Sequence, residues 1–318
     1  MTRTASETIF IALALLLAPI AFARGQEAPN AEWDARDVIP YEEFIIMGHR
    51  GMGEEAPEGT IESFRAAWSL GLSPEADIRT TKDGVIVSFH DDNFKRIIPD
   101  ASAEVQNRGV KDVTYAELST LDVGAYMGEK FRGQRAVAVA EIVAALKEDS
   151  KRLIFCDLKN VDLQQFARET AEVWPQVYLT SSDYNALKEW KRLAPSGKTR
   201  LWTPRAWVDK PSEMASGFEK VAAENFAALD VYEIHAKLDA QGKLILPTRE
   251  TIRAMSERAR QNGALFEIMP LTYGDQEFPY LSLLDAGATA LSTDYPTAAA
   301  RPLKTYYSKK DQGGATER

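Results

Sequence analysis

Cysteine and histidine are scarce in this sequence, which limits the chemistry that these two residue types can carry. The 318 residues include one cysteine, Cys156, and three histidines, His49, His90 and His235. A single cysteine cannot form an internal disulfide. Because Cys156 follows the apolar run Leu153-Ile154-Phe155, we expect it to be a small buried hydrophobe and neither a nucleophile nor a metal ligand.

The sequence also lacks an excess of positive charge. It has 38 Lys and Arg residues against 47 Asp and Glu residues, a formal net charge of −9. Nucleic acids select basic surfaces, so this balance argues against a nucleic acid as the main partner. A small phosphorylated substrate stays compatible with it, because a pocket can be locally positive on an acidic protein.

Long apolar runs are absent except near the N-terminus. Arg3 precedes the apolar run Ile9–Phe22, and Ala21-Phe22-Ala23 has the small residues of a cleavage site. We therefore expect a signal peptide over residues 1–23, export to the periplasm or the medium, and no stable membrane insertion after cleavage. The run is too short for a comfortable membrane span. The alternative is a signal anchor that stays uncleaved.

From Tyr41 onward, short apolar runs alternate with longer helical patterns. This alternation predicts a (β/α)8 TIM barrel, which typically needs about 250 residues. A doubly wound open sheet is the alternative, but no G-x-G-x-x-G motif follows the first strand. The expected strands are Phe44–Met47, Glu75–Thr81, Leu153–Leu158, Val177–Thr180, Arg200–Thr203, Ala228–Ile234, Ala264–Met269 and Ala288–Ser292.

The same pass along the chain predicts how it is divided. We expect an exposed leader over residues 24–40, the barrel domain over 41–306 and a disordered tail over 307–318. Residues 92–138 show no strong period and follow the second expected strand. We therefore predict a small insertion there, at the mouth of the barrel.

Charged side chains follow the expected strands at the ends where barrel active sites are built. His49 and Arg50 come after the first strand, and His90 ends a second short strand. On a strand, alternate residues share a face, so Glu75, Asp77 and Arg79 could all point into the barrel, as could Asp157 and Lys159. Two inward carboxylates indicate a bound cation; an internal ion pair with Arg79 on a solvated edge is the alternative.

An ordered set of motifs carries a resemblance to a known family. The motifs are Gly48-His49-Arg50-Gly51, Ala56-Pro57-Glu58-Gly59-Thr60, Glu75-x-Asp77, Thr81-x-Asp83-Gly84, His90-Asp91, Asp157-x-Lys159 and Thr293-Asp294-Tyr295-Pro296. In order and spacing they resemble the glycerophosphodiester phosphodiesterase family over about residues 45 to 300.

The resemblance implies a barrel with an insertion after its second strand. It also implies metal-dependent hydrolysis of glycerophosphodiesters to glycerol 3-phosphate and an alcohol. Residue by residue, it assigns the acid/base pair to His49 and His90, the metal ligands to Glu75, Asp77 and Asp157, phosphate binding to Arg50 and Lys159, and a supporting carboxylate to Glu58. Oxygen ligands favour Ca²⁺, Mg²⁺ or Mn²⁺. The nucleophile is either water or a neighbouring hydroxyl of the substrate.

Three positions depart from the family pattern. The usual Pro-Glu-Asn-Thr reads Pro57-Glu58-Gly59-Thr60, and the usual Glu-x-Lys reads Asp157-Leu158-Lys159. The expected Trp-Thr-x-Asn is replaced by Leu265-Phe266-Glu267-Ile268-Met269-Pro270.

Three further questions stay open. The first concerns the substrate: the protein could instead be a related barrel phosphodiesterase or phospholipase that acts on another lipid or sugar phosphodiester. The second is whether the protein is an enzyme or a binding protein of barrel fold; the retained histidines and carboxylates argue against a binding protein. For His235 we weigh pocket lining against a buried structural role, and we assign Asp294 to capping or orienting the last loop.

Overall fold

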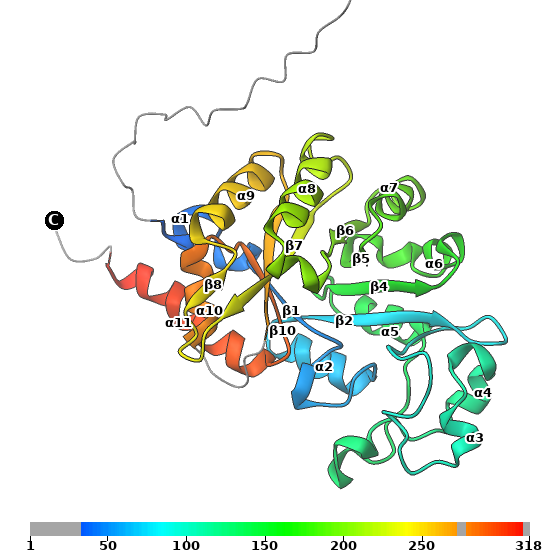
Figure 1. Cartoon of the computed structure of the whole chain (residues 1–318). Coiled ribbons are helices and arrows are strands. Elements are labelled where there is room, and N and C mark those ends of the chain that lie inside the picture. Colours follow the sequence, from blue (N-terminus) through cyan, green and yellow to red (C-terminus); the bar gives the residue numbers. More distant parts are fainter. Residues whose placement is uncertain (1–32, 272–277, 314–318) are drawn as a thin grey trace, which may run out of the picture. The chain divides into compact units, whose positions relative to one another are not determined.

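The structure is a computed structural model, and it describes residues 33–271 and 278–313. Eight parallel strands form the centre of this part of the chain (Figure 1). The predicted signal peptide lies outside the described residues. The barrel strands are β1 (Ile45–Gly48), β2 (Ser73–Thr80), β4 (Ile154–Asn160), β5 (Val177–Ser181), β6 (Lys198–Leu201), β7 (Val231–Leu238), β9 (Leu265–Leu271) and β10 (Ala290–Thr293).

The first strand closes the sheet on itself. β1 pairs in parallel with β10 from Ile45 opposite Ala290 to Gly48 opposite Thr293, and it also pairs with β2. Two short strands, β3 (Ile86–Ser88) and β8 (Leu244–Leu246), extend β2 and β7 in antiparallel fashion outside the closed ring. Closure confirms the predicted (β/α)8 barrel and excludes the open doubly wound sheet.

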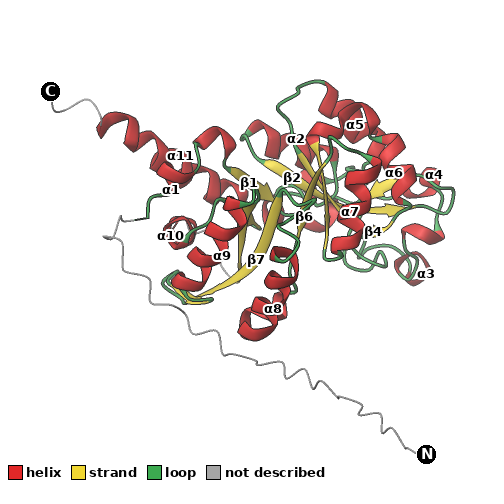
Figure 2. Cartoon of the chain, turned by 90° about the horizontal axis from the view of Figure 1, so that it is seen from above, coloured by secondary structure: helices red, strands yellow, loops and turns green. Residues whose placement is uncertain are grey.

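Helices surround the strands (Figure 2). Several begin at the capping residues that the sequence offers: the side chain of Thr60 accepts a hydrogen bond from the amide of Ser63, and Thr248 from Thr251. No helix among the described residues is long and apolar enough to cross a membrane. The α-helices are α1 (Ala35–Val38), α2 (Ile61–Ser69), α3 (Ala103–Gln106), α4 (Tyr115–Leu118), α5 (Val139–Lys147), α6 (Leu163–Glu169), α7 (Tyr184–Leu193), α8 (Pro211–Ala222), α9 (Arg249–Gln261), α10 (Phe278–Ala286) and α11 (Pro296–Gly313). The 3₁₀ helices are η1 (Tyr41–Glu43), η2 (Gly53–Glu55), η3 (Val110–Asp112), η4 (Ala125–Met127), η5 (Glu129–Phe131), η6 (Ala171–Gln176) and η7 (Arg205–Asp209).

Successive residues of β2 point to opposite faces of the strand, so up to Ile78 its apolar side chains lie on one face and its charged side chains on the other. Ala76 and Ile78 belong to the large apolar cluster that the strands share with the surrounding helices, whereas Glu75 and Asp77 face the barrel interior. A smaller apolar cluster fills part of that interior: Ile45, Met47, Phe155, Tyr178, Val231 and Ala290. The charged side chains therefore share the barrel interior with a layer of apolar side chains.

The insertion after β2 folds around its own small core. It contains α3, α4, η3, η4 and η5, and it lies to one side of the barrel in Figure 1. Its buried side chains continue the apolar face of β3, and the amide of Val137 donates to the carbonyl of Gly59 at 3.1 Å. The buried members of the insertion include Phe94, Ile97, Val110, Val113, Leu118 and Val123. Apolar burial, without long helices or strands, accounts for the missing period in this stretch.

Two predictions about the ends of the domain are wrong for the residues that the structure describes there, 33–40 and 307–313. The expected exposed leader includes α1, where Ala35 is fully buried and Asp34 accepts a 2.8 Å hydrogen bond from the hydroxyl of Tyr306. The expected disordered tail includes the end of α11, and the ring of Tyr307 lies 5.3 Å from that of Tyr41. A four-residue helix is too short to produce a periodic signal, and Pro302 and many polar residues hide the helical pattern of α11.

Candidate active site

All eight predicted site residues line one of two adjoining cavities at the carboxyl ends of the barrel strands. His49 borders both. The larger cavity, about 270 Å³, is lined by His49, Arg50, Gly53, Glu54, Glu58, Arg96, Tyr126, Met127 and Asp294. The smaller, about 200 Å³, is lined by Met47, His49, Glu75, Asp77, His90, Asp157, Lys159, Arg200, Trp202, Arg205, Glu233, His235 and Met269.

Three buried carboxylates gather in the smaller cavity. Glu75, Asp77 and Asp157 are 3%, 4% and 8% exposed, and each offers an oxygen within 4.8 Å of the others. Burial, and then the charge of Asp77, raises the pKa of Glu75 to about 8; burial also raises the pKa of Asp157. Carboxylates this close repel one another, and a divalent cation would offset the repulsion. The cluster therefore could hold a hard metal ion.

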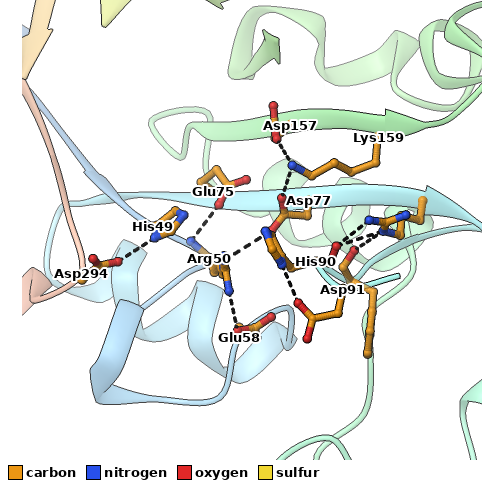
Figure 3. A network of polar contacts seen from close by, with 12 residues as sticks. His49, Arg50, Glu58, Glu75, Asp77, His90, Asp91, Asp157, Lys159 and Asp294 are labelled. Carbon is orange, nitrogen blue, oxygen red and sulfur yellow. Dashed lines mark hydrogen bonds and ion pairs between the residues drawn. The ribbon is translucent and has the colours of Figure 1, made fainter. Parts of the chain in front are cut away.

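Two cations stand beside this cluster. The amide of Arg50 donates to Glu75 at 2.8 Å, and its guanidinium pairs with Glu58 at 3.2 Å and with Asp77 at 3.8 Å (Figure 3). The ammonium of Lys159 lies 3.0 Å from Asp77 and also bonds Asp157. Burial opposes the charge of Lys159, but these two carboxylates outweigh it and raise its pKa.

Arg79 does not join the cluster. A register irregularity after Ile78 turns its side chain toward the loop that follows β3. There its guanidinium donates to the carbonyl of His90 at 2.6 Å and pairs with Asp92 at 2.9 Å. The expectation that Arg79 shares the inward face of Glu75 and Asp77, and the alternative of an internal ion pair with them, are both wrong.

His49 is held by Asp294, which the sequence reasoning left out of the catalytic set. The Nδ1 atom of His49 lies 2.6 Å from an Asp294 carboxylate oxygen (Figure 3). Burial alone would lower the pKa of His49, but the hydrogen bond to Asp294 and the charge of Glu75 outweigh it, so the net shift is upward. A carboxylate on Nδ1 fixes the ring and leaves Nε2 for the cavity.

His90 has a similar partner. Its Nδ1 atom lies 2.6 Å from Asp91, and Arg96 from the insertion bridges Asp91 at 2.8 Å and Glu58 at 2.7 Å. Glu58, His90 and Asp91 also offer oxygen and nitrogen atoms within 4.8 Å of one another. Because Arg96 already forms ion pairs with both carboxylates, a metal cation is less favoured here than at the buried cluster.

The far wall of the smaller cavity carries charged side chains that the sequence reasoning missed. Arg200 on β6 is 5% exposed and bonds Glu267 on β9 at 2.5 Å; it lies 3.7 Å from Glu233 on β7. His235 lines the cavity, and burial lowers its pKa to about 4. Trp202 donates from its indole nitrogen to Asp157 at 2.9 Å.

A closed barrel with buried carboxylates and carboxylate-bound histidines at its carboxyl face fits the TIM-barrel enzymes, whose active sites are built there. The model of the glycerophosphoryl diester phosphodiesterase family matches residues 49–298. The chain therefore belongs to that family, and it is a phosphoric diester hydrolase. The match spans all eight predicted site residues.

Individual relatives agree with this assignment. The chain is 28% identical over 192 residues to a glycerophosphodiester phosphodiesterase of Caldanaerobacter subterraneus subsp. tengcongensis, covering 57% of this chain and 75% of the relative. It is 36% identical over 263 residues to the Bacillus subtilis protein YhdW, covering 80% and 95%.

Solved structures share the fold. A glycerophosphoryl diester phosphodiesterase of Parabacteroides distasonis superimposes with a TM-score of 0.63 at 21% identity, covering 82% of this chain and 86% of that one. An Oleispira antarctica phosphodiesterase in complex with sn-glycerol-3-phosphate gives 0.58 at 20% identity, covering 85% and 99%.

Proposed function

We propose that this chain is a metal-dependent glycerophosphodiester phosphodiesterase that releases glycerol 3-phosphate and an alcohol, with His49 and His90 as its acid/base pair. One observation supports this most strongly. Three buried carboxylates lie within 4.8 Å of one another in a cavity that two carboxylate-bound histidines also line. The product in the Oleispira antarctica relative supports the substrate class.

The residues present fit a divalent cation. Glu75, Asp77 and Asp157 would hold Ca²⁺, Mg²⁺ or Mn²⁺, because all three offer the oxygen ligands that these ions prefer. Burial keeps the carboxylates poorly hydrated, so they gain more from a cation than exposed carboxylates would. When bound, the cation would supply Lewis-acid stabilisation of negative charge on the phosphate oxygens.

The protein's own groups carry the proton transfers. One histidine removes the proton from the attacking oxygen, of water or of a substrate hydroxyl, as that oxygen bonds to phosphorus. The other donates a proton to the alcohol oxygen as its bond to phosphorus breaks, and such transfers contribute about 10²–10⁴-fold each. Asp294 and Asp91 orient the two rings through Nδ1. Arg50 and Lys159 border the site and would balance the phosphate charge.

A substrate panel tests this proposal. Purified protein is incubated with glycerophosphodiesters of several alcohols and with lipid and sugar phosphodiesters, first with a chelator and then with each of the three metals. The released glycerol 3-phosphate and the other hydrolysis products are measured. We expect release of glycerol 3-phosphate only when metal is present. Hydrolysis of lipid or sugar phosphodiesters in preference to every glycerophosphodiester would favour the rival substrate class.

We also propose that the protein is exported. The charged start at Arg3, the apolar run Ile9–Phe22 and the small residues Ala21 and Ala23 support this. Protein from the periplasm or the medium should begin at Arg24. Recovery of the uncleaved chain from the membrane fraction would instead indicate a signal anchor.

A further inference from the structure

The cavity wall that faces the acidic cluster is polar without contributing to that cluster. In the order of the closed barrel, β7 stands four strands from β2, so the two strands lie on opposite sides of the interior. Glu233 and His235 occupy alternate positions on β7 and both line the smaller cavity, as Glu75 and Asp77 on β2 do. Glu233 and His235 therefore face the acidic cluster across the same cavity.

Each of these two side chains has a buried polar atom without a hydrogen-bond partner among the described residues. The atoms are Oε1 of Glu233 and Nδ1 of His235. They lie 3.1 Å apart but are not aligned for a hydrogen bond with one another. The other oxygen of Glu233 accepts from the amide of Thr203 at 3.3 Å. Glu233 is 1% exposed, and a buried polar atom left without a partner costs about 1–3 kcal/mol.

The buried cation of this wall, Arg200, already has a counter-charge in Glu267. Arg200 makes three hydrogen bonds to the carboxylate of Glu267, at 2.5, 3.0 and 3.0 Å, and one to Thr180. Glu233 is therefore not needed as its principal counter-charge, and its nearest oxygen lies 3.7 Å from the guanidinium. The pair Glu233 and His235 thus remains available to a ligand.

The pair is uncharged near neutral pH. Burial raises the pKa of Glu233 to about 8, and burial lowers the pKa of His235 to about 4. Glu233 then carries a carboxyl proton and His235 is neutral, so together they offer both donors and acceptors. Such a pair suits hydroxyl groups better than a phosphate or an ammonium group.

We propose that Glu233 and His235 form a subsite that binds two adjacent hydroxyls of the substrate, across the cavity from the acidic cluster. This proposal rests on the proposed function, because a glycerophosphodiester carries two adjacent hydroxyls on its glycerol. The two unpartnered atoms are close enough for one diol to reach both. A site with buried polar groups discriminates strongly against analogues that lack the matching hydroxyls, since those groups then stay unpartnered.

Binding of two small ligands tests the subsite without requiring turnover. The ligands are sn-glycerol 3-phosphate and propyl phosphate, which has the same three-carbon chain but no free hydroxyls. Calorimetry in the presence of Mn²⁺ gives the affinity ratio of the two ligands for the parent protein and for Glu233→Leu, Glu233→Gln and His235→Phe. Far-ultraviolet circular dichroism and melting curves show that each variant is folded.

We expect the parent to prefer glycerol 3-phosphate and each of Glu233→Leu and His235→Phe to lose about tenfold in that preference, the size of one hydrogen bond. Glu233→Gln keeps the shape and neutral hydrogen bonding of a protonated carboxyl, so it should retain most of the preference. The control is Arg205→Gln. Arg205 borders the same cavity but is exposed and forms no hydrogen bond or ion pair with a described residue, so its loss should weaken both ligands by the same factor.

Equal affinities of the parent protein for the two ligands would overturn the subsite, as would unchanged ratios in both Glu233→Leu and His235→Phe. A parent protein that hydrolyses no glycerophosphodiester but still prefers glycerol 3-phosphate would refute the proposed function and leave the diol subsite standing.

Discussion

Replacing Asp294 with Asn tests whether His49 depends on its carboxylate partner. The change keeps the size of the side chain and removes its charge, so the 2.6 Å contact with His49 Nδ1 loses its ionic character. Hydrogen bonds to charged groups contribute about 1.5–3 kcal/mol. His49 and Asp294 are 30% and 38% exposed, and solvent screening places this bond in the lower half of that range. A loss of about 1.5–2 kcal/mol corresponds to a roughly ten- to thirtyfold lower kcat.

The assay is kcat on a glycerophosphodiester with an unactivated alcohol, measured across pH. Because Asp294 raises the pKa of His49, the limb of the profile that belongs to His49 should move to lower pH in Asp294→Asn. The matched control is Glu55→Gln. Glu55 bonds the amide of Thr297 at 2.9 Å and so supports the same loop, but it has no hydrogen bond to His49. A kcat within twofold of the parent and an unmoved profile in Asp294→Asn would refute a role through His49.

Variants at three other positions examine separate parts of the site. Asp157→Asn should weaken Mn²⁺ binding severely, whereas Asp157→Glu should stay active with an altered preference among Mg²⁺, Mn²⁺ and Ca²⁺. Both variants are measured by their metal-dependent turnover. An unchanged metal affinity in Asp157→Asn would show that Asp157 pairs with Lys159 and is not a metal ligand. His90→Ala should lower kcat at least about a hundredfold on an unactivated ester. Turnover of a nitrophenyl ester, which needs no protonation of its leaving group, should recover much of this loss only if His90 is the general acid. Near-normal turnover of the unactivated ester would show that His90 does not belong to the acid/base pair. Arg96→Gln breaks the ion pairs that connect the insertion to Glu58 and Asp91. Since Arg96 is 43% exposed, we expect a loss of only about two- to fivefold in kcat/KM. An unchanged kcat/KM would show that these ion pairs are dispensable.

The barrel could be predicted because each strand has a strong local signal. The expected first strand, Phe44–Met47, and β1 differ by one residue at each end, and every other expected strand overlaps an observed one. Apolar runs and capping residues act over a few positions, so a single sequence reveals them. The short strand β8 was missed, because Leu244–Leu246 lies in a polar stretch and pairs only with β7.

The parts of the site that were missed depend on contacts between distant segments. Asp294 reaches His49 across 245 positions, because β10 and β1 join where the barrel closes. Arg200 on β6 and Glu267 on β9 pair across 67 positions. No local pattern reports which charged residue faces which, so these partners required the three-dimensional structure.

The central claim is that the buried carboxylate cluster holds the metal on which hydrolysis depends. The direct measurement is release of glycerol 3-phosphate by thoroughly chelated protein, before and after addition of Mn²⁺, for the parent and for Glu75→Gln, with Mn²⁺ binding followed in parallel. We predict no release by the chelated parent, full recovery with Mn²⁺, and neither binding nor recovery in a folded Glu75→Gln variant. Full activity of the chelated parent, or tight Mn²⁺ binding by Glu75→Gln, would contradict the account.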